Sequence, residues 1–341
     1  ADAVEPTPMP RRLIAPLLAL ALVALFPLSG ATFYVELTTK IMIMAIFALS
    51  LDLLVGWTGL VSFGHAAFFG VGAYALALLS PKAAAAGLWS SLALAIGAAA
   101  LCAFVVGVFV LRTRGIYFIM VTLAFAQMFY FVFHDTDFGG GSDGRYVNLK
   151  PDASILGFTP FDLDKPDQIY FVVLAVLVLV FLFLQMLLRS PFGRALQGIK
   201  ANEQRMRALG YPVTAYKLAA FTLAGALAGL AGYLLAAQSG FVNPEILSWH
   251  QSGNVLLMVI LGGAGTPYGP IAGAFALTML HEFFSSITRH WQLFLGAAIV
   301  LIPEFEQLAA ILDNGPCAER LGKTGDLRWR LGVARGAAQR V

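Results

Sequence analysis

Charged residues are scarce in this chain: aspartate, glutamate, lysine and arginine make up 12% of its 341 residues. Hydrophobic residues account for 59% of the sequence, and the mean hydropathy is +0.79. A soluble domain cannot bury that much apolar surface in its interior. The composition therefore excludes a soluble protein, including a large one with unusually apolar helices. The apolar side chains must face lipid, and the sequence predicts an all-α, polytopic membrane protein.

Cysteine is nearly absent as well. Cys102 lies in an apolar run and Cys317 near the C-terminus, and neither has ligand spacing with other residues. We therefore expect no disulfide framework and no metal site. The string "HDTD" (134–137) matches no specific metal cage, and a solvated loop explains it better. No stretch resembles a nucleic-acid-binding motif, so we predict no nucleic-acid partner.

A nucleotide-binding motif is missing too. No segment has the form GxxxxGK[ST], whose backbone amides cradle phosphates. Any ATP that drives this protein must therefore be hydrolysed by another chain. We expect no cofactor in this chain, with ATP and magnesium held by partner subunits.

Ten apolar segments are present, several of them as long as the roughly 20 residues that a bilayer core requires. Two glycine-interrupted stretches, near 56–72 and 262–273, are not expected to cross as straight helices. The ten predicted segments are 13–29, 38–55, 65–80, 89–111, 115–133, 169–188, 214–237, 251–263, 268–287 and 291–312.

Basic residues are unevenly distributed among the connecting segments. Arg11 and Arg12 precede the first segment, and six basic residues lie within 189–217, whereas seven aspartates outnumber the basic residues of 134–168. Because basic loops remain in the cytoplasm, we predict an N-in, C-in topology. The alternative for the first segment is a signal peptide. The predicted regions are a cytoplasmic N-terminus (1–12), a transmembrane domain (13–312) with an external loop (134–168) and a cytoplasmic helix (189–213), and a basic cytoplasmic tail (313–341).

The segment "SPFGRALQGIKANEQRMRALGYP" (190–212) is polar and basic in an otherwise apolar chain. Ser190 is suited to cap a helix and Pro191 to start it, while Gly210 and Pro212 end it. Each lysine or arginine would cost roughly 2.5–3.5 kcal/mol at the centre of a membrane. We therefore predict one amphipathic helix on the cytoplasmic surface. It either rests on lipid headgroups or inserts into a groove of a cytoplasmic partner.

Several stretches of the sequence resemble permeases of branched-chain amino-acid ABC transporters. They are "ALSLDLLVGWTGLVSFGHAAFFGVGAYALALL" (48–79), "LRTRGIYFIMVTLAFAQMF" (111–129), "GGGSDG" (139–144), "GRALQGIKANEQRMRALGYPVTAYKLAAFTLAGALAGLAGYLLA" (193–236) and "VILGGAGTPYGPIAGAF" (259–275). The resemblance covers about residues 40–300, and it is to the larger, M-type permease of the two that such transporters pair. The C-terminal "LIPEFEQLAAIL" departs from the usual ending of the family.

This resemblance implies a set of partners in a bacterial inner membrane: a second homologous permease, two ATP-binding subunits and a periplasmic solute-binding protein. The basic helix would then be the coupling helix that contacts an ATP-binding subunit. The residues expected to carry this contact are Arg194, Ile199, Lys200, Glu203, Arg205, Met206, Leu209 and Gly210.

The two glycine-rich patches, 56–79 and 262–280, end in the similar strings GAYALALL and GAFALTML. Interrupted helices at matching positions of two halves often mark a transport path, although glycines also serve close packing alone. Asp52 is an ionisable residue beside an apolar run, and it is either functional or held by a helix–helix hydrogen bond. The residues expected to line or gate the substrate path are Gly56, Gly59, Ser62, Gly64, His65, Gly262, Gly263 and Gly265.

These observations predict the permease subunit of an ATP-driven importer for branched-chain or related amino acids, not an enzyme. The alternatives are an ATP-independent carrier or channel for small neutral solutes and, third, a polytopic membrane enzyme. By resemblance the substrates are leucine, isoleucine and valine, but relatives also serve urea, amides and aromatic acids. The external binding protein would make most of that choice.

Overall fold

The computed structural model describes residues 26–29, 32–80, 87–137, 139–147, 151, 165–287 and 296. The chain divides into two compact units, 1–278 and 279–341, and the architecture below is that of the first unit. Regions 1–12 and 313–341 lie outside the described residues, as do most of the predicted spans 13–29 and 291–312.

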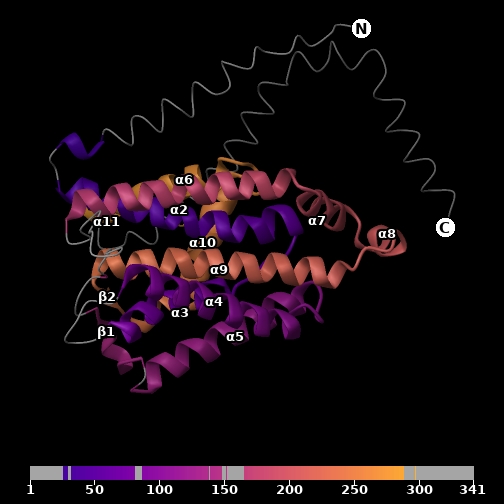
Figure 1. Ribbon diagram of the computed structural model, residues 1–341, viewed down its shortest axis with the longest axis horizontal. Coiled ribbons are helices and arrows are strands. Elements are labelled where there is room, and N and C mark those ends of the chain that lie inside the picture. The colour runs from indigo at the N-terminus through magenta and orange to yellow at the C-terminus, as the bar shows by residue number, and fades with distance from the viewer. Residues whose placement is uncertain are drawn as a thin grey trace, which may run out of the picture. The chain divides into compact units, whose positions relative to one another are not determined.

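Helices dominate the part of the chain that the structure describes, which confirms the all-α prediction (Figure 1). Each observed helix matches a predicted segment to within a few residues, apart from the polar segment discussed below. The helices are α2 (Thr32–Thr58), α3 (His65–Leu79), α4 (Leu88–Val110), α5 (Ile116–Asp135), α6 (Pro166–Arg189), α7 (Pro191–Ala201), α8 (Glu203–Ala208), α9 (Val213–Ser239), α10 (Trp249–Gly262) and α11 (Gly269–Ile287). The short elements are the 3₁₀ turns η1 (Phe26–Ser29), η2 (Gly141–Asp143) and η3 (Pro244–Leu247) and the strands β1 (Arg145–Tyr146) and β2 (Phe241–Val242).

Five of the described helices are long and apolar enough to cross a membrane: α2, α4, α5, α6 and α9. Helix α3 has 15 residues and is about 22 Å long, shorter than a hydrocarbon core of roughly 30 Å. Both glycine patches interrupt the helices as predicted, between α2 and α3 and between α10 and α11. The protein is therefore a multi-pass membrane protein, and the side of the membrane that each loop faces stays a prediction.

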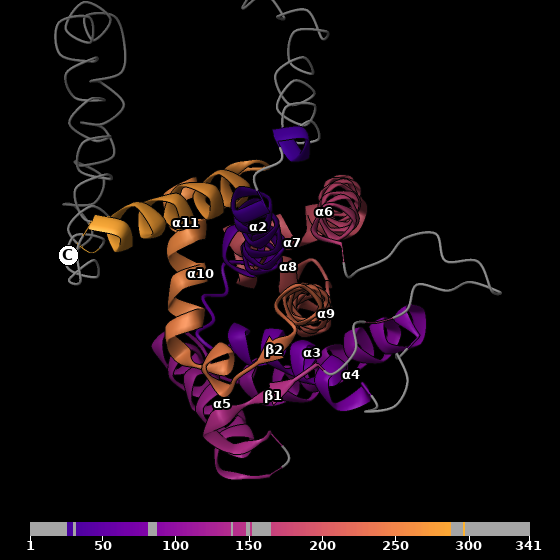
Figure 2. The ribbon, with the colours of Figure 1, turned by 90° about the vertical axis from the view of Figure 1, so that its left-hand side faces the viewer.

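Helix α9 lies between α2 on one side and α3 and α4 on the other (Figure 2). Lipid gives no hydrophobic drive for helices to associate, so close approach between small residues must hold them together. On α4, Ala95, Ala99 and Ala103 recur every fourth position and are fully buried. They face Gly225 and Gly229 of α9, where an added Cβ would collide with the Ala103 and Ala99 methyl groups.

Helices α3 and α9 approach equally closely. A Cβ at Gly232 would collide with the backbone carbonyl of Phe69, and a Cβ at Gly72 would collide with the carbonyl of Gly229. A side-chain hydrogen bond also joins α4 to α9: the hydroxyls of Ser91 on α4 and Tyr233 on α9 lie 2.7 Å apart and are buried. Glycine at these sites is thus required by contact with a neighbouring backbone.

Helices α7 and α8 lie at one end of the first unit, and strands β1 and β2 lie at the other (Figure 1). At one end, Arg114 of the α4–α5 connection lies 3.9 Å from Glu203 of α8. At the other, β1 and β2 pair antiparallel, with Arg145 opposite Val242. The basic segments 112–114 and 189–217 therefore share one end, and the described part of the acidic 134–168 connection lies at the other.

Candidate functional site

The polar segment after α6 forms two helices, so the prediction of a single helix over 190–212 was wrong. Ser190 begins α7 as predicted, because its hydroxyl accepts a hydrogen bond from the Gly193 amide at 3.4 Å. Asn202 then adopts an extended backbone, and its side-chain oxygen accepts from the Arg205 amide at 2.9 Å. An asparagine that caps a new helix competes with continuation of the old one, and this local choice divides the segment. Gly210, with φ of +86°, ends the second helix.

The underside of α7 is apolar and buried. Leu196 and Ile199 are 0% and 2% exposed, and α7 packs against both α2 and α6. Met206 of α8 folds back onto α7, since a Cβ added at Gly198 would lie 2.9 Å from the Met206 sulfur. The structure thus places Ile199 where it holds α7 to the rest of the protein, and Met206 where it joins α8 to α7.

An ion-pair cluster centred on Glu203 holds α8 in place. Its carboxylate accepts from Lys217 of α9 at 2.7 Å and from Arg207 at 2.6 Å, and Arg114 lies 3.9 Å away. These interactions, the Lys217 hydrogen bond first among them, hold the pKa of the Glu203 carboxyl below its usual 4.5. Three separate segments therefore meet at one carboxylate. The hollow at this meeting point holds about 360 Å³ and is lined by Arg114, Asn202, Glu203, Gln204 and Arg207.

A Glu203→Gln variant tests this cluster. A carboxylate whose pKa is lowered in the folded state stabilises that state above its unfolded pKa, and the stabilisation is lost as pH falls through the folded value. We therefore expect the variant to be less stable than the unmodified protein at neutral pH, with the difference disappearing below pH 4.5. Thermal unfolding of both proteins in detergent over that pH range measures the difference. A difference that stays constant into acid would exclude the charge of Glu203 as its origin.

The outer side of α7 and α8 is exposed and mostly basic. Leu209 is an apolar residue on this mostly basic side, and its side chain is 65% exposed. We call this outer side the docking surface; its residues are Arg194, Gln204, Arg205, Arg207 and Leu209. The docking surface combines a rigid support with exposed positive charge and one exposed apolar side chain, a combination that suits a site for a partner protein.

The two glycine-rich loops meet at the end of α2. A Cβ added at Gly56 would lie 2.7 Å from the Gly265 Cα, so these two backbones are in direct contact. Gly59, Gly263 and Gly265 have φ values of +74°, +93° and +81°, in the left-handed region that favours glycine. The structure therefore brings together the two patches that lie about 200 positions apart in the sequence, as a shared transport path would require.

The remaining predicted path residues pack against neighbouring helices. A Cβ at Gly64 would collide with the carbonyl of Thr122 on α5, and one at Gly262 would collide with that of Gly269. Ser62 is fully buried, and its hydroxyl accepts from the Gly64 amide at 3.2 Å. His65 is also fully buried and lies 2.9 Å from the Ser50 hydroxyl of α2.

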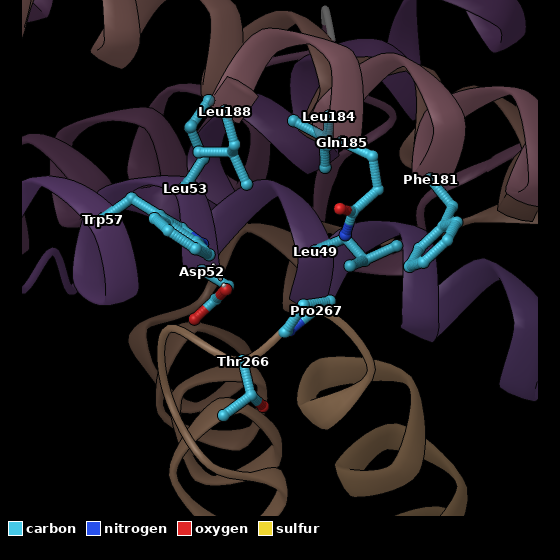
Figure 3. Close-up of a pocket in the computed structure, with 10 residues that line it drawn as sticks. All are labelled: Leu49, Asp52, Leu53, Trp57, Phe181, Leu184, Gln185, Leu188, Thr266 and Pro267. Atoms are coloured by element: carbon cyan, nitrogen blue, oxygen red, sulfur yellow. Dashed lines mark hydrogen bonds between the residues drawn. The ribbon is translucent and has the colours of Figure 1, made fainter. Parts of the chain in front are cut away.

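The sequence leaves Asp52 as either a functional residue or one held by a helix–helix hydrogen bond, and the structure gives its carboxylate two partners. Its carboxylate accepts from the Gly265 amide at 2.8 Å and from the Trp57 indole at 3.1 Å. Figure 3 shows Asp52 and Trp57 on α2, facing Thr266 and Pro267 of the α10–α11 loop across a pocket that α6 closes. The pocket holds about 10 Å³, which is roughly the room that a single water molecule needs.

Comparisons with known proteins agree on one family. The family described as "Branched-chain amino acid transport system / permease component" matches residues 33–303. The chain is 34% identical over 308 residues to the high-affinity branched-chain amino acid transport system permease protein LivM of Salmonella typhimurium, covering 84% of this chain and 72% of the relative. LivM of Escherichia coli K12 is 34% identical over 307 residues, covering 84% and 71%.

A more distant similarity is to the autoinducer 2 import system permease protein LsrC of Photorhabdus laumondii. It is 27% identical over 167 residues, covering 47% of this chain and 49% of the relative. No solved structure matches the chain. The family match includes α7, α8 and both glycine-rich loops. The chain therefore belongs to the branched-chain amino acid transport permeases, and it is a membrane-embedded permease subunit of an ABC importer, not an enzyme.

Proposed function

We propose that this permease subunit carries branched-chain or related amino acids across a bacterial inner membrane, driven by ATP-binding subunits that dock on α7 and α8. The observation that carries the proposal is the docking surface. Its support is rigid because Leu196 and Ile199 are buried beneath it and because Glu203 joins α8 to α9 and to Arg114. A rigid element transmits a displacement that a loosely held helix would absorb.

The alternative for this segment, a helix that rests on lipid headgroups, explains the docking surface less well. A helix lying in the headgroup region turns its apolar side to the acyl chains and its charges to water. Here the apolar side of α7 is already occupied by the protein, and Leu209 is exposed among charged residues. An apolar side chain within a charged rim fits a protein partner with an acidic groove.

The assembly that we propose follows from the family. It has a second homologous permease, two ATP-binding subunits and a periplasmic solute-binding protein, and this chain adopts the N-in, C-in topology. The docking surface then faces the cytoplasm. The β1–β2 end faces the periplasm, where the binding protein delivers solute.

A neutral or zwitterionic solute fits the described helices best. Asp52 is the one buried acidic side chain among the described residues, and both of its oxygens already accept hydrogen bonds. The buried carboxylate of that part of the chain is thus already engaged by protein donors at both oxygens. The LivM relatives are named for branched-chain amino acids, which have neutral side chains.

The first experiment is gentle affinity purification of the chain from its native membrane, followed by mass spectrometry and reconstitution into liposomes. We expect two ATP-binding subunits and a second permease to co-purify. With the binding protein added, uptake of leucine, isoleucine or valine should require ATP. A chain that elutes alone and moves solute without ATP would contradict the proposal and support the ATP-independent carrier or channel.

A further inference from the structure

The buried carboxylate of Asp52 connects two segments that are 213 positions apart. Its first oxygen accepts from the Gly265 amide, in the loop between α10 and α11, and its second accepts from the Trp57 indole. Hydrogen bonds to an ionised acceptor are roughly twice as strong as neutral ones. Asp52 is only 3% exposed, so water does not compete for these bonds. The α10–α11 loop is thereby fixed to the last turns of α2.

A second polar contact connects the same turns of α2 to the docking helices. The ammonium of Lys200, at the end of α7, donates to the backbone carbonyl of Gly56 at 2.5 Å, across 144 positions of sequence. Carbonyls in the last turn of a helix have no partner within that helix and carry its negative dipole end, so a lysine is well suited to bind there. The Lys200 side chain also lies over Gly59, where an added Cβ would be 3.3 Å from its Cγ.

The backbones of Gly56 and Gly265 touch between these two contacts. A Cβ at Gly56 would collide with the Gly265 amide and with the Asp52 carboxylate. The Lys200 side chain reaches Gly56, and from Gly56 to Gly265 the path continues through two backbones in direct contact. Packed contacts of this kind move together, because a close-packed junction has little room to deform.

We propose that Asp52, Gly56, Lys200 and Gly265 form a coupling latch that carries motion of α7 to both glycine-rich loops. The proposal rests on the proposed function, in which an ATP-binding subunit moves α7. When α7 shifts, Lys200 displaces the end of α2, and the loop before α3 and the loop before α11 move in step. Asp52 and Lys200 are positioning residues in this scheme: they hold backbone segments and do not touch the solute.

The first test compares uptake with ATP hydrolysis in liposomes that contain the complete transporter. Lys200→Met keeps an unbranched, exposed side chain but cannot donate to Gly56. We expect uptake per ATP hydrolysed to fall about tenfold, the size of a typical coupling between sites, while hydrolysis itself stays within about twofold. Lys200→Arg, which still donates, should restore most of the ratio. Arg112→Met removes an exposed positive charge at the same end and should leave the ratio unchanged.

The second test measures hydrogen exchange of the 263–268 segment in the purified protein. In Asp52→Ala the Gly265 amide loses its acceptor, and we expect its exchange to accelerate at least about tenfold. Lys200→Met should accelerate exchange in the same segment, although Lys200 does not touch it directly. A merely local role for Lys200 would leave that exchange unchanged.

Two results would overturn the latch: unchanged exchange at 263–268 in Lys200→Met, or uptake and hydrolysis that fall in equal proportion in that variant. Failure of the proposed function looks different. In that case the unmodified chain recruits no ATP-binding subunit, yet the exchange measurement still decides whether Lys200 and Asp52 hold the two loops together.

Discussion

An Arg205→Glu variant is expected to lose its ATP-binding subunits while remaining folded. Arg205 is exposed on the docking surface, and its backbone amide, not its guanidinium, makes the contact to Asn202. Reversing its charge places a carboxylate against the acidic groove that we propose on the partner. Like charges that face each other across an interface commonly cost about 2 kcal/mol or more, so we expect affinity to weaken about thirtyfold or further.

The choice of Arg205 alone comes from the structure. The neighbouring Arg207 donates to Glu203 at 2.6 Å, so reversing both charges would also repel Glu203 and release α8. A double variant could therefore lose its partners either because the docking surface has changed charge or because α8 is no longer held in place. Arg205→Glu changes the docking surface and leaves the Glu203 cluster intact.

Co-purification followed by quantitative mass spectrometry measures the effect, and ATP-dependent uptake should fall with it. Lys165→Glu is the matched control, because it reverses an exposed charge at the other end of α6 from α7. We expect the control to keep its partners. If Arg205→Glu retains the ATP-binding subunits as well as Lys165→Glu does, the docking surface lies elsewhere.

The largest effect on stability is expected from Gly232→Leu. The new side chain would start inside the space held by the Phe69 carbonyl, and backbone atoms cannot move aside as a flexible side chain does. Helices α3 and α9 would have to separate along the contact that lies at the centre of the described bundle. An oversized side chain typically lowers the free energy of unfolding by about 1–3 kcal/mol where neighbouring side chains can move. Because backbone atoms block this site, we expect Gly232→Leu to lower it by about 4 kcal/mol or more.

Size-exclusion chromatography and thermal unfolding in detergent measure this loss. Gly97→Leu provides the control, since Gly97 of α4 is exposed and an added Cβ meets nothing within 4 Å. Replacing a helical glycine in open space should be neutral or slightly stabilising. Equal stability of the two variants would mean that the α3–α9 contact is not as close as the structure has it.

Much of the fold could be predicted because a membrane-spanning helix is a property of one continuous stretch of chain. Its length and apolar character are set locally by the bilayer, so the segments 65–80 and 89–111 correspond to α3 and α4 almost residue for residue. The two interruptions followed from glycine content in the same way. The prediction of a single polar helix was wrong, because Asn202 caps a second helix within the segment.

In the candidate site too, local features could be predicted from the sequence and long-range contacts could not. Ser190 could be identified as a cap from its position, since a capping hydroxyl acts within three residues of itself. From the sequence, Lys217 is one of the six basic residues of 189–217, and Arg114 is a basic residue between two apolar segments. Their meeting at Glu203 depends on how α9 and the α4–α5 connection pack.

The sequence by itself determined that this protein lies in a lipid membrane, and it determined the order of the helices. It also determined the two glycine-rich interruptions between helices and the family. Each of these follows from short stretches read in order, because hydrophobic length, capping and turn formation are local. Only the tertiary structure decided that Asp52 holds the Gly265 amide and that Lys200 holds the Gly56 carbonyl. Such contacts join residues that local chemistry leaves independent, and close helix packing is what brings them within hydrogen-bonding distance.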